Sequence, residues 1–195
     1  ISLSLLLLSV KFLKENKLLK YIMLVIFASL FHKTALIFLL LYPLKYIKLN
    51  KNTMIIFSIV VLLLFLFGDV VINFILSFIY KPANTTFHSG SGYKLLILLY
   101  CLSLFAFDYK DKLKNLGSYN LDFIKFLMLG TMIQSLSPTF ENTGRITLYF
   151  FPFLCIIVSN LLELIKNIKL TILMFIVLSI YFYIKTNNLF YELLF

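Results

Sequence analysis

The chain has 195 residues, of which 62% are hydrophobic and 13% are charged, and its formal net charge is +10. Water-soluble domains contain about 45–50% apolar residues, so this composition excludes an ordinary soluble domain and predicts a membrane protein. Most lysines lie in short clusters between long apolar segments, as in the cytoplasmic turns of membrane proteins, so the charge indicates orientation and argues against a nucleic-acid partner.

The apolar segments predict an all-α, polytopic transmembrane helical bundle that forms a single transmembrane domain over residues 1–195. Each segment has about 13–25 apolar residues, as expected for membrane helices. The first run, Ile1–Val10, would cover only about 15 Å of a hydrocarbon core about 30 Å thick. We therefore expect that the first helix is cut and that the chain is part of a longer membrane protein.

The next segment, Tyr21–Leu44, has the length of one membrane span but lysine clusters on both sides. The positive-inside rule places both clusters in the cytoplasm, which a single crossing would violate. Two short limbs, Leu18–Phe31 and Thr34–Leu44, broken at Phe31-His32-Lys33, would satisfy the rule as a broken or re-entrant helix pair. A single helix with a buried polar centre is the alternative.

A second break is predicted at Gly68-Asp69, between an outward helix over Thr53–Phe67 and a segment Val70–Tyr80 along the outer interface. Glycine, proline, serine and asparagine then indicate an irregular outer loop. The remaining predicted elements, in order, are this loop (81–94), an inward helix (95–107), a cytoplasmic linker (108–120), an outward helix (121–136), an outer loop (137–145), an inward helix (146–165) and an outward helix (170–184).

Arg145 is the only arginine, and it stands at the start of an apolar run. Its planar, permanently charged guanidinium can bind a phosphate or a carboxylate with two parallel hydrogen bonds, which lysine cannot. Arg145 either binds an anionic headgroup or forms a structural ion pair with Glu141, four residues earlier. Tyr149, one turn later, either presents its phenol to the same site or is an interfacial tyrosine.

His32 and Lys33 lie between apolar limbs, where ionisable groups are costly and indicate function, although Lys33 could also extend to the interface. His88 is either a binding residue or an exposed side chain of the outer loop. Asp69 and Lys125 form either a buried pair or separate helix-end charges.

The two cysteines, Cys101 and Cys155, are expected to be buried small hydrophobic residues. The sequence has no cluster with metal-ligand spacing and no glycine-rich nucleotide loop, so we expect neither a metal nor a cofactor.

Two stretches, Ala28–Ile37 (ASLFHKTALI) and Gly144–Phe150 (GRITLYF), carry motifs that resemble those of the EpsG family of Wzy-like polymerases of bacterial surface polysaccharides. The stretch Ala28–Ile37 (ASLFHKTALI), followed by Leu41-Tyr42-Pro43, is similar to an A-x-x-F-H-K-[ST]-A-L segment of that family. Gly144-Arg145-Ile146 with Tyr149-Phe150 is similar to its later R-x-x-x-Y-F segment. The resemblance implies that the chain is the C-terminal part of a family member, with a fold comparable to the GT-C glycosyltransferases.

The resemblance implies a multi-pass glycosyltransferase of the bacterial inner membrane. It would transfer a polyprenyl-diphosphate-linked glycan onto a lipid-linked repeat unit at the outer face, with membrane lipid and other polysaccharide assembly proteins as further partners. Arg145 would hold the diphosphate. His32 or Glu141 would take the proton of the acceptor hydroxyl. The substrate-binding candidates are Arg145, Lys33, Tyr149 and His88.

Three alternatives remain at the level of sequence. A transporter or flippase of lipid-linked glycans would also use a broken helix and a cationic cavity, but no internal repeat is visible. An O-antigen ligase would use the same donor with another acceptor. A non-catalytic membrane subunit would have polar residues that do not share one face.

Overall fold

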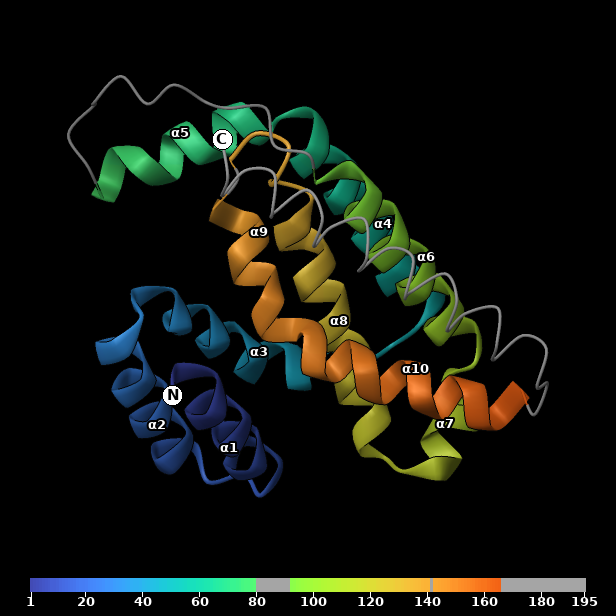
Figure 1. Ribbon diagram of the computed structural model, residues 1–195. Helices are drawn as coiled ribbons and strands as arrows, with labels where there is room; N and C mark the ends of the chain where they lie inside the picture. The colour runs from blue at the N-terminus through green and yellow to red at the C-terminus, as the bar shows by residue number, and fades with distance from the viewer. Residues whose placement is uncertain (80–91, 141, 166–195) are drawn as a thin grey trace, which may run out of the picture.

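The computed structural model describes residues 1–79, 92–140 and 142–165, and these residues form helices and short connections with no strand. The all-α prediction is therefore confirmed for this part of the chain. The elements, drawn in Figure 1, are α1 (Ser2–Lys14), α2 (Leu18–Phe31), the 3₁₀ helix η1 (Lys33–Leu40), α3 (Leu41–Lys45), α4 (Lys51–Leu66), α5 (Gly68–Ile79), α6 (Tyr93–Asp108), α7 (Lys110–Leu116), α8 (Tyr119–Gln134), α9 (Asn142–Thr147), the 3₁₀ helix η2 (Leu148–Phe150) and α10 (Phe151–Ile165).

Helix α8 lies at the centre, in contact with α3, α4, α6, α7, α9, η2 and α10. Most of its residues are buried, among them the polar Lys125, Thr131 and Gln134, as its central position requires. Against α6, the hydroxyls of Ser103 and Thr131 lie 3.2 Å apart, and each also bonds to a carbonyl of its own helix. Small hydroxyl residues of this kind allow close helix packing within an apolar environment.

Helices α1 and α2 form an antiparallel pair joined by a tight turn. Asn16 has a φ of 58°, and the amides of Asn16 and Lys17 bond back to Leu13 and Phe12, which together make a Schellman-type helix end. Asparagine suits this position because it tolerates the left-handed conformation better than most residues. The turn brings the lysines at the end of α1 and the start of α2 to one end of the pair.

The chain reverses a second time at His32. Helix α2 ends at Phe31, His32 is extended (φ −153°, ψ 110°), and η1 then runs back along α2. The hydroxyl of Tyr21, at the start of α2, donates to the carbonyl of Phe38, near the end of η1. Two residues so far from His32 on either side can meet only if the limbs are antiparallel.

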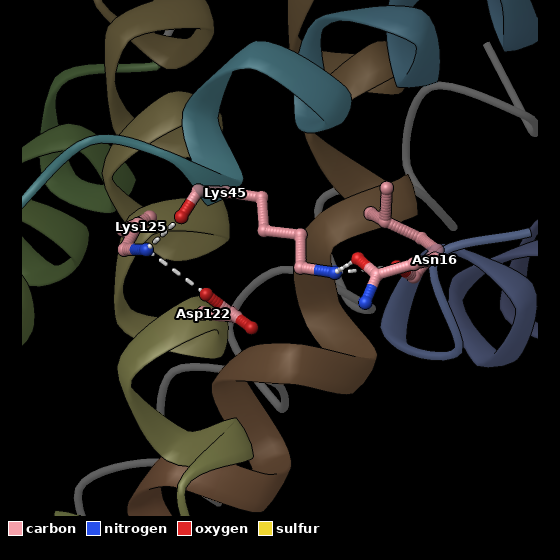
Figure 2. Close-up of polar contacts among 5 residues, drawn as sticks. Asn16, Lys45, Asp122 and Lys125 are labelled. Atoms are coloured by element: carbon pink, nitrogen blue, oxygen red, sulfur yellow. Dashed lines mark hydrogen bonds and ion pairs between the residues drawn. The ribbon is translucent and has the colours of Figure 1, made fainter. Parts of the chain in front are cut away.

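A cluster of polar contacts closes the open end of this hairpin (Figure 2). The Lys45 ammonium donates to the Leu13 carbonyl at 2.8 Å and to Asn16 Oδ1 at 2.5 Å, so the end of the second limb lies beside the α1–α2 turn. The buried Lys125 of α8 donates to the Lys45 carbonyl at 2.7 Å and to Asp122 Oδ1 at 2.9 Å. The break at His32 and the two antiparallel limbs are therefore confirmed, and the alternative of one continuous helix is wrong. That both ends of the hairpin face the cytoplasm stays a prediction.

Within this cluster the partner of Lys125 is Asp122, three residues earlier on the same helix, and not Asp69. Asp69 lies in the first turn of α5. The prediction of a buried pair between Asp69 and Lys125, one of the two alternatives for these charges, is therefore wrong.

The break at Gly68 is also present. Helices α4 and α5 meet there with their axes bent by 80°, and α5 runs across the end of the molecule (Figure 1). By length and apolar composition, the described residues contain one helix able to cross a membrane, Thr143–Ile165. The bent pair Lys51–Leu66 with Gly68–Ile75 counts as a second membrane-crossing segment only if both of its helices belong to one span. The polytopic bundle remains a prediction.

The outer surface is apolar over long stretches. Helix α4 exposes Ile55, Ile56, Ile59, Leu62 and Leu66, each more than half accessible. Continuous apolar surfaces of this kind are unfavourable in water and suit contact with other apolar groups.

The two cysteines share this surface: Cys101 and Cys155 are exposed, so the prediction that they are buried is wrong. An apolar run predicts burial only in a soluble protein, because a membrane helix is apolar on its outer face too.

Candidate functional site

The site is built around the break at His32. The His32 amide donates to the Ala28 carbonyl at 3.2 Å, and the His32 carbonyl accepts from the Ala35 amide at 2.9 Å, so the extended residue is held on both sides. The η1 helix that follows has eight residues, and 3₁₀ helices of that length are uncommon. Both His32 and Lys33 are exposed at this tip.

The tip of the hairpin meets η2, which carries Tyr149. The imidazole of His32 and the Tyr149 ring lie edge to face with centroids 6.1 Å apart. Thr34 connects them: its Oγ1 is 2.6 Å from His32 Nδ1 and donates to the Tyr149 hydroxyl at 3.4 Å. Residues 115 positions apart in the sequence are thus joined by one threonine hydroxyl.

An aromatic cluster behind Tyr149 fixes this meeting point. Phe38 of η1 is fully buried, and its ring lies 5.5 Å from Phe150, 6.2 Å from Tyr149 and 6.3 Å from Phe153. Gly130 of α8 allows the approach on the other side, because a Cβ placed there would lie 2.9 Å from the Phe150 Cβ. The hairpin and the η2 segment are therefore packed as one unit.

Arg145 lies one turn before Tyr149. Thr143 and Thr147 are buried in the same helix, α9, which contacts α8, so Arg145 occupies the opposite, exposed face. Within the described ranges, the Arg145 guanidinium has no hydrogen bond or ion pair with another side chain. A guanidinium in this state retains all five N–H donors for an anion.

The chain bends a few residues after Arg145, and this bend has a local cause. Pro152 stands near the start of α10, where its ring lacks the N–H that would bond to the Leu148 carbonyl. The chain forms η2 at that place, and the ribbon changes direction between α9 and α10 (Figure 1). The bend places Tyr149 at the hairpin tip. Helix α9, which carries Arg145, leads from there towards the end of the molecule at which α5 lies (Figure 1).

The structure thus brings together two of the predicted site residues, His32 and Tyr149, with Lys33 next to His32 and Arg145 one turn from Tyr149. Glu141 and His88 lie outside the described residues, so the predicted Glu141–Arg145 pair stays a prediction. Sequence analysis missed the linking role of Thr34, although Thr34 belongs to the motif that contains His32. It also missed Phe38, for which the sequence carried no signal beyond an apolar residue.

Metal-ligating side chains do not gather in the described ranges: no group of three or more histidine, cysteine, aspartate or glutamate residues occurs there that could hold a metal ion. The groups that gather are an imidazole, a hydroxyl and a phenol. Two cationic side chains, Lys33 and Arg145, follow or precede them by at most one turn along the chain and have no partner within those ranges. Such a set can move a proton and can bind an anion.

Comparison with known proteins gives one clear relationship. No curated protein and no solved structure matches the chain, so the likeness to the GT-C fold stays a prediction. The EpsG family, in contrast, matches residues 1–193, which is nearly the whole chain, and includes both motifs that meet at the hairpin tip. The chain therefore belongs to the EpsG family, a membrane-associated family with a role in polysaccharide biosynthesis.

Proposed function

We propose that the protein is a polymerase of a bacterial surface polysaccharide, such as a capsule, an exopolysaccharide or an O-antigen. It transfers a growing glycan from a polyprenyl diphosphate carrier onto a lipid-linked repeat unit at the outer face of the inner membrane, which it crosses several times. The observation that carries the proposal is that both motifs of the family meet at one place, through the contact of His32 and Thr34 with Tyr149.

In this reaction the acceptor hydroxyl oxygen attacks the anomeric carbon of the donor glycan. The bond from that carbon to the diphosphate oxygen breaks, and the polyprenyl diphosphate leaves with the electron pair. The acceptor proton passes to a general base, for which His32 is our first candidate and Glu141 the second. Because the donor is already activated by its diphosphate, the step needs no nucleotide sugar.

Arg145 and Lys33 provide the positive charge that the leaving group requires. Both side chains are exposed and, within the described ranges, unpaired. A guanidinium can bind two diphosphate oxygens at once, whereas an ammonium acts as a point charge. Preorganised donors at a developing negative charge lower the barrier most, so Arg145 is the main contributor and Lys33 and Tyr149 assist in substrate binding. His88 remains a proposed binding residue of the outer loop.

Substitution of Arg145 tests this proposal in cells that depend on the protein for their polysaccharide. We expect Arg145→Gln to lower polymerisation by about 100-fold or more and Arg145→Lys by about tenfold, because lysine keeps the charge but loses the two-pronged geometry. Glycan length is measured on gels, with protein abundance in the membrane as a control. Lys48→Gln, at the opposite end of the hairpin, is the matched control and should leave chain length unchanged.

Unchanged chain length in Arg145→Gln at normal abundance would refute the role of Arg145. A flippase would give a different pattern, in which lipid-linked repeat units accumulate on the inner leaflet when the protein is impaired. A polymerase variant accumulates single repeat units on the outer leaflet.

A further inference from the structure

The hydrogen bonds at the hairpin tip form a short chain that runs from His32 through Thr34 to Tyr149. Thr34 Oγ1 lies between His32 Nδ1 at 2.6 Å and the Tyr149 hydroxyl at 3.4 Å, and Thr34 donates its hydrogen to Tyr149. A threonine hydroxyl has one hydrogen but two lone pairs. With that hydrogen directed to Tyr149, Oγ1 accepts from His32, an arrangement that places the proton on Nδ1.

A neutral imidazole has one N–H, so a proton on Nδ1 leaves Nε2 with a free lone pair. We propose that Thr34 is a positioning residue that holds His32 as its Nδ1–H tautomer and so presents Nε2 as the proton acceptor. The purpose of this tautomer rests on the proposed polymerase function: Nε2 takes the proton of the acceptor hydroxyl as the glycosidic bond forms. The tautomer itself is a property of the resting protein.

The surrounding structure restricts the imidazole in a way that suits this role. The backbone of His32 is held by hydrogen bonds to Ala28 and Ala35, and its ring packs edge to face against Tyr149. Tyr149 in turn packs against the buried Phe38. His32 remains exposed, whereas Thr34 is half-buried. A base whose second nitrogen is fixed by a neighbour is a recurring arrangement for proton transfer.

The first experiment measures the tautomer directly by ¹⁵N NMR of histidine-labelled, full-length protein in nanodiscs, at a pH where His32 is neutral. A His32→Gln sample identifies the signals of His32. We expect protonated Nδ1 and unprotonated Nε2 in the wild type and in Thr34→Ser. Thr34→Val has almost the same shape without the hydroxyl, and we expect it to shift His32 to the Nε2–H tautomer that unconstrained histidine favours.

A wild-type spectrum with Nε2 protonated, or a Thr34→Val spectrum equal to that of the wild type, would overturn the inference. Ser29→Ala is the matched control, because Ser29 lies on the same hairpin but its hydroxyl bonds to the Ile26 carbonyl of its own helix and not to His32. It should leave the His32 signals unchanged.

The second experiment measures the rate of glycan elongation by the same variants. General-base catalysis contributes about 10²–10⁴-fold, so we expect Thr34→Val to lose about tenfold to 100-fold and Thr34→Ser to recover most of that loss. Rescue by serine separates positioning from packing, because serine restores the hydroxyl but not the methyl group. A wild-type rate in Thr34→Val would contradict the inference and leave the polymerase proposal intact. Absence of elongation by the wild type would refute the polymerase proposal, while the NMR result would still decide the role of Thr34.

Discussion

Phe38 joins the hairpin to the segment that carries Tyr149, and its removal should separate them. Phe38 is fully buried and its ring contacts those of Tyr149, Phe150 and Phe153. In a membrane protein the transfer of a ring from lipid to the protein interior contributes little, because both are apolar. The cost of Phe38→Ala is therefore mainly that of the cavity and of the lost ring contacts.

The magnitude follows from these two contributions. A cavity of about 100 Å³ at about 24 cal/mol per Å³ costs about 2 kcal/mol. The aromatic pairs add about 0.5–1.5 kcal/mol. We therefore expect Phe38→Ala to lower the free energy of unfolding by about 2–4 kcal/mol and to lower polymerisation as well, since Tyr149 loses its support.

The measurement is reversible unfolding in mixed micelles followed by circular dichroism. Phe27→Ala is the matched control, because Phe27 loses the same atoms from an exposed position on α2 and, among the residues that the structure describes, has one ring partner, Phe31. We expect that control to change the free energy by less than about 0.5 kcal/mol. Equal losses in the two variants would show that Phe38 does not connect the two parts of the site.

Three further predictions concern what positions the site. Gly130→Ala should destabilise the protein by about 1–3 kcal/mol in the same unfolding assay, because the added Cβ would lie 2.9 Å from the Phe150 Cβ. Gly144→Ala is the control and should be tolerated, because the contacts of its added Cβ lie beyond 3.7 Å. Asp122→Asn removes the charged partner of the buried Lys125 and should cost about 1–3 kcal/mol, measured against Asp111→Asn at an exposed position; equal stability of the two would refute the pairing. Single cysteines at Asn16 and Lys48, in a protein without Cys101 and Cys155, should react with an impermeant thiol reagent from the cytoplasmic side only, and labelling of the two from opposite sides would contradict the hairpin.

Charge patterning was sufficient to predict the hairpin. Two lysine clusters separated by one span's length of apolar residues cannot both lie in the cytoplasm unless the chain turns back, and His32 is where it does so. The break at Gly68 was equally local, since a glycine and an aspartate interrupt an apolar run. Both features are encoded by residues close together in sequence.

The contacts within the site, in contrast, join residues that are far apart in sequence. The bond between Thr34 and Tyr149 depends on how the hairpin packs against η2. This packing is set by Phe150, which belongs to the second motif, and by Phe38 and Gly130, which no local pattern singles out. The partner of Lys125 could have been found, because Asp122 is three residues away on the same helix and such residues are neighbours. The exposure of Cys101 could not have been predicted, because apolar positions on both faces of a membrane helix look alike in sequence.

Reconstitution shows whether the protein, as we claim, extends a glycan on a lipid diphosphate carrier. Purified full-length protein in liposomes receives only the polyprenyl-diphosphate-linked repeat unit, and the products are separated by size. We predict a ladder of longer glycans, one polyprenyl diphosphate released for each bond formed, and loss of the ladder in Arg145→Gln. Single repeat units that remain unchanged in the presence of folded wild-type protein would contradict the claim.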